Sequence, residues 1–188
     1  MKKITFILFA ALFANAGMAQ KYVPKIGVNA VINYDVVATA SGQQIPLTLT
    51  MESVTDPVIF RWAIPGLGTG KFQLSPAGFQ SGTQMRLTEP QDGTTKLGDD
   101  ETIMVISKDS FNSLVKNQTF MLNKGKFDAK PDTLKYKIND KEADVIHAAT
   151  ANGKVHIWVL NNPDFPLICR LTGNPGGIDF DLLSIKEQ

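Results

Sequence analysis

The chain has 188 residues, with 19 lysine and arginine residues against 18 aspartate and glutamate residues, and one cysteine, Cys169. This near-neutral balance, with no run of more than two basic residues, argues against the basic surface of a nucleic-acid-binding protein. A single cysteine excludes an internal disulfide, so the hydrophobic core must supply the stability of the fold.

Residues 1–19 have the organisation of a cleaved signal peptide. Two lysines follow the initiating methionine, an apolar run extends from Ile4 to Phe13, and Gly17-Met18-Ala19 offers small residues before a cleavage point at Gln20. The apolar run is far shorter than the roughly 20 residues that span a bilayer. We therefore predict a periplasmic or secreted protein, with residues 20–188 forming a single domain that has no membrane span and no lipid anchor.

Alternation of apolar and polar residues predicts strands through the first half of the domain. Such segments occur around residues 28–36, 44–51 and 58–64, and again around residues 133–138. A period of two with one polar face is typical of an antiparallel sheet that covers a core on one side.

The C-terminal third predicts a meander of four antiparallel strands. Asn152-Gly153 favours a two-residue type I′ turn, because both central positions of that turn need a positive φ. The resulting register places His147 opposite Trp158 and Ala149 opposite His156. Strands around residues 166–172 and 178–185 complete the meander.

Two short helices are predicted between these regions. Ser107 can cap a helix in which Phe111, Leu114 and Val115 share one face, and Ser75-Pro76 begins a second, shorter helix. Residues 88–100 form the longest connection without predicted structure. The sequence thus predicts a mainly β (α+β) fold: a curved antiparallel sheet or incomplete β-barrel with one or two short helices.

The residue patterns do not favour an enzyme, a metal site or a bound cofactor. The glycine-rich segment from Gly66 to Lys71 fails the spacing of a phosphate-binding loop. His147, His156 and Cys169 are zinc ligands by type, but the predicted register places Trp158 between His147 and the strand of Cys169. We therefore predict no catalytic residues and no metal ligands.

The chain resembles periplasmic proteins of the lipoprotein-carrier-like superfamily (the LolA/LppX type). The resemblance covers about residues 28–186 and rests on three segments, Asp99–Ser107, Asn162–Ile168 and Asp179–Ile185. It implies a half-barrel whose apolar cavity holds acyl chains, with short helices in its mouth. The aromatic candidates for lining such a cavity are Phe60, Trp62, Trp158 and Phe180.

The leading hypothesis is an exported, non-enzymatic binding or carrier protein for a lipid or another apolar small molecule. The alternative is an envelope protein-interaction or structural module with a filled core, whose partner is another envelope protein. A third hypothesis, a hydrolase that uses Cys169 or the histidines, requires a reactive thiol.

Overall fold

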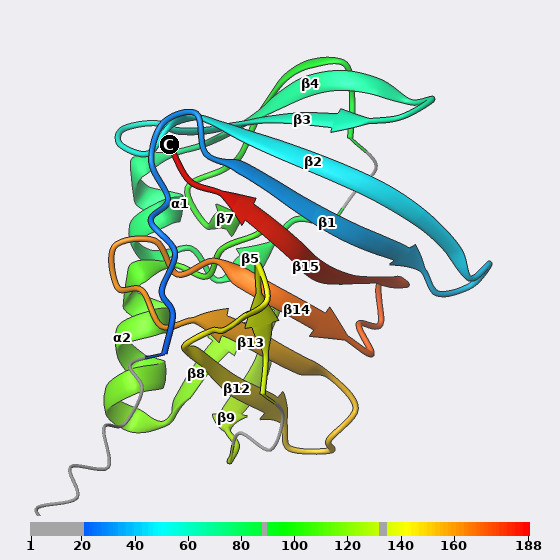
Figure 1. Cartoon of the computed structure of the whole chain (residues 1–188). Helices are drawn as coiled ribbons and strands as arrows, with labels where there is room; N and C mark the ends of the chain where they lie inside the picture. Colours follow the sequence, from blue (N-terminus) through cyan, green and yellow to red (C-terminus); the bar gives the residue numbers. More distant parts are fainter. Residues whose placement is uncertain (1–20, 88–89, 132–134) are drawn as a thin grey trace, which may run out of the picture.

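One large curved sheet dominates the computed structural model, which describes residues 21–87, 90–131 and 135–188. Its eleven strands follow the order β6-β4-β3-β2-β1-β15-β14-β13-β12-β9-β8. Figure 1 shows the sheet arching from β4 at the top to β8 and β9 at the bottom, without closing into a barrel. The strands of this sheet are β1 (Val31–Ala38), β2 (Gln43–Ser53), β3 (Val58–Ile64), β4 (Gly68–Leu74), β6 (Gly93–Lys96), β8 (Thr119–Leu122), β9 (Gly125–Ala129), β12 (Val145–Thr150), β13 (His156–Leu160), β14 (Ile168–Thr172) and β15 (Ile178–Lys186).

Two helices stand along one side of the sheet (Figure 1). In α1 (Pro76–Ser81) the Ser75 hydroxyl accepts a hydrogen bond from the Gly78 amide, and proline occupies the first turn. In α2 (Lys108–Asn117) the Ser107 hydroxyl accepts from the Ser110 amide. Both predicted helices, and the mainly β curved fold with short helices, are confirmed.

Two short strand pairs complete the structure. The strands β5 (Gln84–Met85) and β7 (Glu101–Thr102) pair in parallel beside α1, and β10 (Lys137–Ile138) pairs with β11 (Lys141–Glu142). Within the described residues, no helix is both long enough and apolar enough to cross a membrane.

The strand register separates an inner row of side chains from an outer row. Directly paired residues on adjacent strands point to the same side of a sheet, whereas sequence neighbours point to opposite sides. The inner row, which faces the core, is Ala148, Ile157, Leu171, Phe180, Val36 and Ile45. The outer row is His147, Trp158, Arg170, Asp181, Asp35 and Pro46.

Two tyrosines bridge a place where the sheet opens. The strands β14 and β15 form only two residue pairs, Arg170 with Asp181 and Leu171 with Phe180. Beyond them the Tyr136 hydroxyl lies 2.9 Å from the Cys169 carbonyl oxygen and 3.2 Å from that of Leu182. The Tyr34 hydroxyl donates to the Ile168 carbonyl at 2.8 Å. The Ile168 carbonyl thus accepts from a side chain, and the single proton of the Tyr136 hydroxyl has the Cys169 and Leu182 carbonyls and the Asp181 carboxylate within reach.

The predicted β12–β13 register is confirmed, but the predicted turn is wrong. His147 pairs with Trp158 and Ala149 with His156. Of the two central residues, only Gly153 has a positive φ, so the turn is not type I′. The Asn152 side chain accepts from the Lys154 amide and the Gly153 amide donates to the Thr150 carbonyl, which widens the loop by one residue on each side.

Two other expectations need correction or lie outside the described residues. The connection over residues 88–100 is not without structure, because Gly93–Lys96 forms β6, which pairs in parallel with β4. The predicted strand around residues 133–138 is reduced to β10, and residues 132–134 lie outside the described part of the chain. The predicted signal peptide, residues 1–19, lies outside it as well.

Candidate functional site

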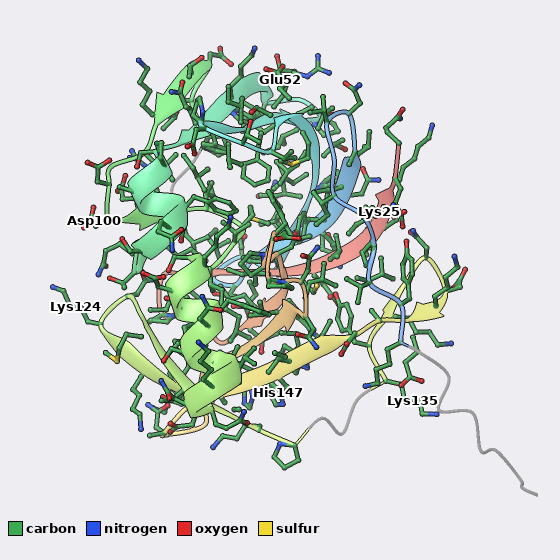
Figure 2. The ribbon with its side chains drawn as sticks, turned by 90° about the vertical axis from the view of Figure 1, so that its left-hand side faces the viewer. Lys25, Glu52, Asp100, Lys124, Lys135 and His147 are labelled. Atoms are coloured by element: carbon green, nitrogen blue, oxygen red, sulfur yellow. The ribbon has the colours of Figure 1, made fainter. Side chains whose placement is uncertain are left out.

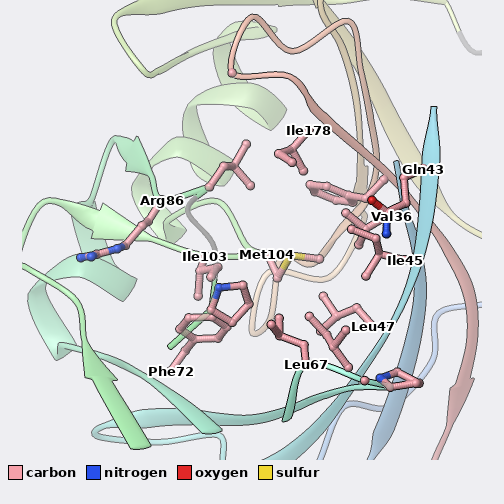
Figure 3. Close-up of a pocket in the computed structure, with 17 residues that line it drawn as sticks. Val36, Gln43, Ile45, Leu47, Leu67, Phe72, Arg86, Ile103, Met104 and Ile178 are labelled. Atoms are coloured by element: carbon pink, nitrogen blue, oxygen red, sulfur yellow. The ribbon is translucent and has the colours of Figure 1, made fainter. Parts of the chain in front are cut away.

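A pocket of about 720 Å³ opens between the N-terminal half of the sheet and the segments that follow β5 and β7. Figure 3 shows its side chains converging from the strands on one side and from the Ile103–Met104 segment on the other. Its lining residues are Val36, Gln43, Ile45, Leu47, Ile64, Pro65, Gly66, Leu67, Phe72, Arg86, Leu87, Pro90, Ile103, Met104, Gly176, Ile178 and Phe180.

Three adjacent strands build the first wall of the pocket. Val36 of β1 lies between Ile45 of β2 and Phe180 of β15 in the register, so the three side chains form one continuous apolar row on the inner side of the sheet. Leu47 lies two residues further along β2 and points the same way. Strand alternation thus presents four apolar side chains to one space.

The opposite wall is a non-periodic segment that the sheet holds in place. Met104 has φ +57°, a conformation unusual for a residue with a side chain. Its carbonyl accepts a hydrogen bond from the Ile168 amide at 2.8 Å, and Val105 forms a β-bridge with Leu167. Figure 3 shows the Met104 thioether extending toward Ile45. These bonds fix Ile103 and Met104 opposite the sheet.

Exposure falls from the rim of the pocket to its floor. Leu67, in the turn between β3 and β4, is 44% exposed and forms part of the rim together with Gln43. The floor is almost entirely shielded from solvent, with Phe72, Met104 and Phe180 each exposing less than a twentieth of their surface. An apolar molecule could therefore enter from solvent and lose most of its water contact inside.

Polar groups lie at the edges of the pocket rather than in its floor. Arg86 is the charged residue among the described lining residues, and its guanidinium lies 3.4 Å from a carboxylate oxygen of Glu101. Figure 3 shows that guanidinium directed away from the pocket centre. The Gln43 side chain lies on the exposed rim. The interior is thus apolar, and the Arg86 charge at its edge is paired with Glu101.

The four aromatic candidates lie in three different places. Phe180 lines the pocket. Phe60 and Trp62 are fully buried on the inner side of the sheet, where Phe60 contacts Phe165 and Trp62 lies behind Phe72. Trp158 belongs to the outer row and is stacked on His147. The structure therefore brings one of the four candidates to the pocket and places two in the packed core and one on the opposite side of the sheet.

Sequence reasoning missed most of the pocket residues, for two reasons. Val36, Ile45 and Leu47 belong to the predicted alternating strands, so their shared face was readable from the sequence once β1 and β2 are paired. Ile103 and Met104 carry no such signal, because their position depends on hydrogen bonds to β14 and its preceding segment.

Cys169 is buried, and the carboxylates of Asp179 and Asp181 take part in hydrogen bonds of the fold. Cys169 is fully buried, and burial raises the pKa of its thiol well above the ordinary value, with the Asp181 carboxylate adding to the shift. The Asp179 carboxylate accepts hydrogen bonds from the Gly173 and Asn174 amides, which fixes the turn before β15. The Asp181 carboxylate accepts from the Tyr136 hydroxyl at 2.6 Å.

No group of three or more histidine, cysteine, aspartate or glutamate side chains is gathered for metal binding among the described residues. The two histidines do meet on the outer side of the sheet, with ring nitrogens 3.0 Å apart.

Comparison with known proteins adds no relative: no family model, no curated protein and no solved structure matches the chain. The resemblance to lipoprotein carriers therefore stays a prediction from the sequence.

Proposed function

We propose that the protein is an exported, non-enzymatic binding or carrier protein that holds a lipid or another apolar small molecule in the pocket between β1, β2, β15 and Met104. The observation that carries this proposal is the pocket itself, which has a volume of about 720 Å³ and an apolar interior. Small-molecule sites are typically roughly 300–1,000 Å³, concave and largely apolar, with few polar groups at defined points.

The distribution of exposure supports the same function. Burying apolar surface contributes about 25 cal/mol per Å² removed from water. A bound ligand therefore gains the most binding free energy where the pocket walls are apolar and shielded from solvent. The floor residues Phe72, Met104 and Phe180 supply such walls, while Leu67 and Gln43 keep the entrance in contact with solvent. The buried, high-pKa thiol of Cys169 is unsuited to nucleophilic chemistry, which favours a binding function over the hydrolase alternative.

The open pocket also favours a ligand-binding protein over an interaction module with a filled core. A filled core would have side chains of the inner row interdigitated along the whole sheet. Here Val36, Ile45 and Ile178 remain only half-buried on the inner side of the sheet.

The proposal is tested with the uncharged fluorescent probe N-phenyl-1-naphthylamine. Its emission should rise on mixing with the wild-type protein, and Ile45→Asp should weaken binding roughly tenfold or more, because the new carboxylate must be desolvated when the probe binds. Leu67→Asp, at the rim, should weaken it less. The matched control is Leu183→Asp, which introduces the same charge at an apolar residue that is 58% exposed and outside the pocket.

Unchanged binding to the Leu183→Asp variant supports the pocket as the site. Equal binding by the wild type and the Ile45→Asp variant, with both shown to be folded by circular dichroism, contradicts the proposal.

A further inference from the structure

The strands around the apolar pocket carry their charged side chains on the opposite side of the sheet. Phe72 and Phe180 face the pocket, so their sequence neighbours Lys71, Asp179 and Asp181 point the other way. The charged residues of β1, β2, β3, β4, β6 and β15 are Asp35, Glu52, Arg61, Lys71, Lys96, Asp179, Asp181 and Lys186, and the register places all of them on the outer side. The pocket-facing side of these strands is therefore uncharged.

Glu52 holds two of the cations on that outer side. One of its carboxylate oxygens lies 2.7 Å from the Lys71 ammonium nitrogen, and the other lies 3.7 Å from Nε of Arg61. Figure 2 shows Glu52 at the upper margin of the molecule. Lys96 is in register with Gln73, which lies two residues beyond Lys71 and on the same side of β4. The sheet thus separates these three cations from the pocket.

Carboxylates lie at the edge of the pocket. Arg86 is the charged residue among the described lining residues, and its guanidinium is paired with Glu101 and directed away from the pocket centre (Figure 3). The Glu101 carboxylate also accepts a hydrogen bond from the Gly98 amide at 2.9 Å. In the turn between β3 and β4, an oxygen of Asp92 lies 2.9 Å from the position that a Cβ atom would take on Gly68. An anion that enters here would approach carboxylates.

We infer that the pocket selects an uncharged long-chain molecule, such as a fatty alcohol or an ester, and discriminates against fatty-acid anions. The inference rests on the binding function proposed above and names the chemical class of its ligand. A carboxylate that leaves water without gaining a cation as its partner loses a large hydration free energy. An uncharged head group avoids most of this loss, while the hydrocarbon chain is buried to the same extent.

Displacement of N-phenyl-1-naphthylamine by 1-decanol and by decanoate tests the inference, because the two ligands differ in their head groups. At neutral pH the alcohol should bind the wild-type protein at least about tenfold more tightly than the carboxylate. As the pH falls through the pKa of decanoic acid, the acid becomes neutral and its affinity should approach that of the alcohol. Displacement by 1-decanol should not change over the same range and serves as the control.

A cation placed on the rim should shift this preference toward the anion. Gln43 and Gln44 are adjacent exposed residues of β2, of which Gln43 lines the pocket and Gln44 points to the outer side. Gln43→Lys should tighten decanoate binding about two- to fivefold at low salt, the gain expected from an exposed ion pair, and leave 1-decanol binding unchanged. High salt should remove the gain. Gln44→Lys is the matched control and should change neither ligand.

The outcomes separate this inference from the function on which it rests. Decanoate binding to the wild type as tightly as 1-decanol, or equal effects of Gln43→Lys and Gln44→Lys on decanoate binding, would overturn the inference and leave the proposed binding function standing. A wild-type protein that binds neither the probe nor 1-decanol would overturn both.

Discussion

The two halves of the sheet share the same alternation of side chains but differ in how those side chains are packed. In the N-terminal half, Val36 of β1 and Ile45 of β2 face an open pocket on the inner side, and both remain half-buried. In the C-terminal half, even the outer side is packed, because the Trp158 indole lies between the His147 ring and the Arg170 guanidinium. The period of a strand shows which residues share a side, but the covering segments decide whether that side is filled.

The largest expected difference between the halves is in stability. Trp158→Ala should lower the free energy of unfolding by about 3–5 kcal/mol, because it removes a large side chain that is only 5% exposed and leaves a cavity. Ile45→Ala should lower it by about 1 kcal/mol or less, because the side chain already borders an open space. Urea unfolding measures both, and equal losses would show that the pocket is as well packed as the C-terminal half.

Alkaline pH should destabilise the region where β14 and β15 separate. Burial raises the pKa values of Tyr34, Tyr136 and Cys169 above their ordinary values of 10.0, 10.0 and 9.0. Below those values all three groups are neutral in both states, so stability is unaffected. Above them the unfolded chain ionises and the folded one does not, so stability falls by about 1.4 kcal/mol per pH unit for each group.

Unfolding free energies measured between pH 8 and pH 11 test this expectation. Above pH 10, the unfolding free energy of the Tyr34→Phe variant should fall less steeply with pH than that of the wild type, because one of the three ionising groups is absent. A flat profile up to pH 11 would mean that these groups ionise freely in the folded protein.

A smaller effect is expected at neutral pH from the bridging hydroxyl of Tyr136. Tyr136→Phe should cost about 1–3 kcal/mol, because the Asp181 carboxylate loses the hydroxyl that lies 2.6 Å away and the Cys169 and Leu182 carbonyls lose a polar neighbour. Tyr34→Phe removes a donor from one carbonyl and should cost less. Thermal unfolding of the two variants compares them, and a Tyr136→Phe variant as stable as the wild type would show that water replaces the hydroxyl.

Local patterns predicted much of the fold because they depend on neighbouring residues. Ser75 and Ser107 cap the predicted helices, and the pairing of His147 with Trp158 follows from the position of Asn152-Gly153. The prediction of a type I′ turn was wrong because the Asn152 side chain accepts a competing hydrogen bond from the Lys154 amide.

The candidate site was harder to predict because it depends on contacts between distant segments. Trp158 lies on a strand whose two sides are both apolar, so alternation alone could not show that it points away from the pocket. Met104 lines the pocket through a left-handed backbone conformation and a hydrogen bond to Ile168, and neither has a periodic signal. Phe180 was selected only as one of four aromatic residues on predicted strands, and it lines the pocket because it pairs with Val36 across the inner row.

Native mass spectrometry of the protein purified gently from the cells that make it tests the ligand-binding proposal most directly. The account predicts a species heavier than the polypeptide by the mass of one apolar molecule, which organic extraction removes and which the Ile45→Asp variant carries at much lower occupancy. A bare polypeptide from several hosts, or an adduct retained equally by the Ile45→Asp variant, would contradict the assignment of this pocket as a carrier site.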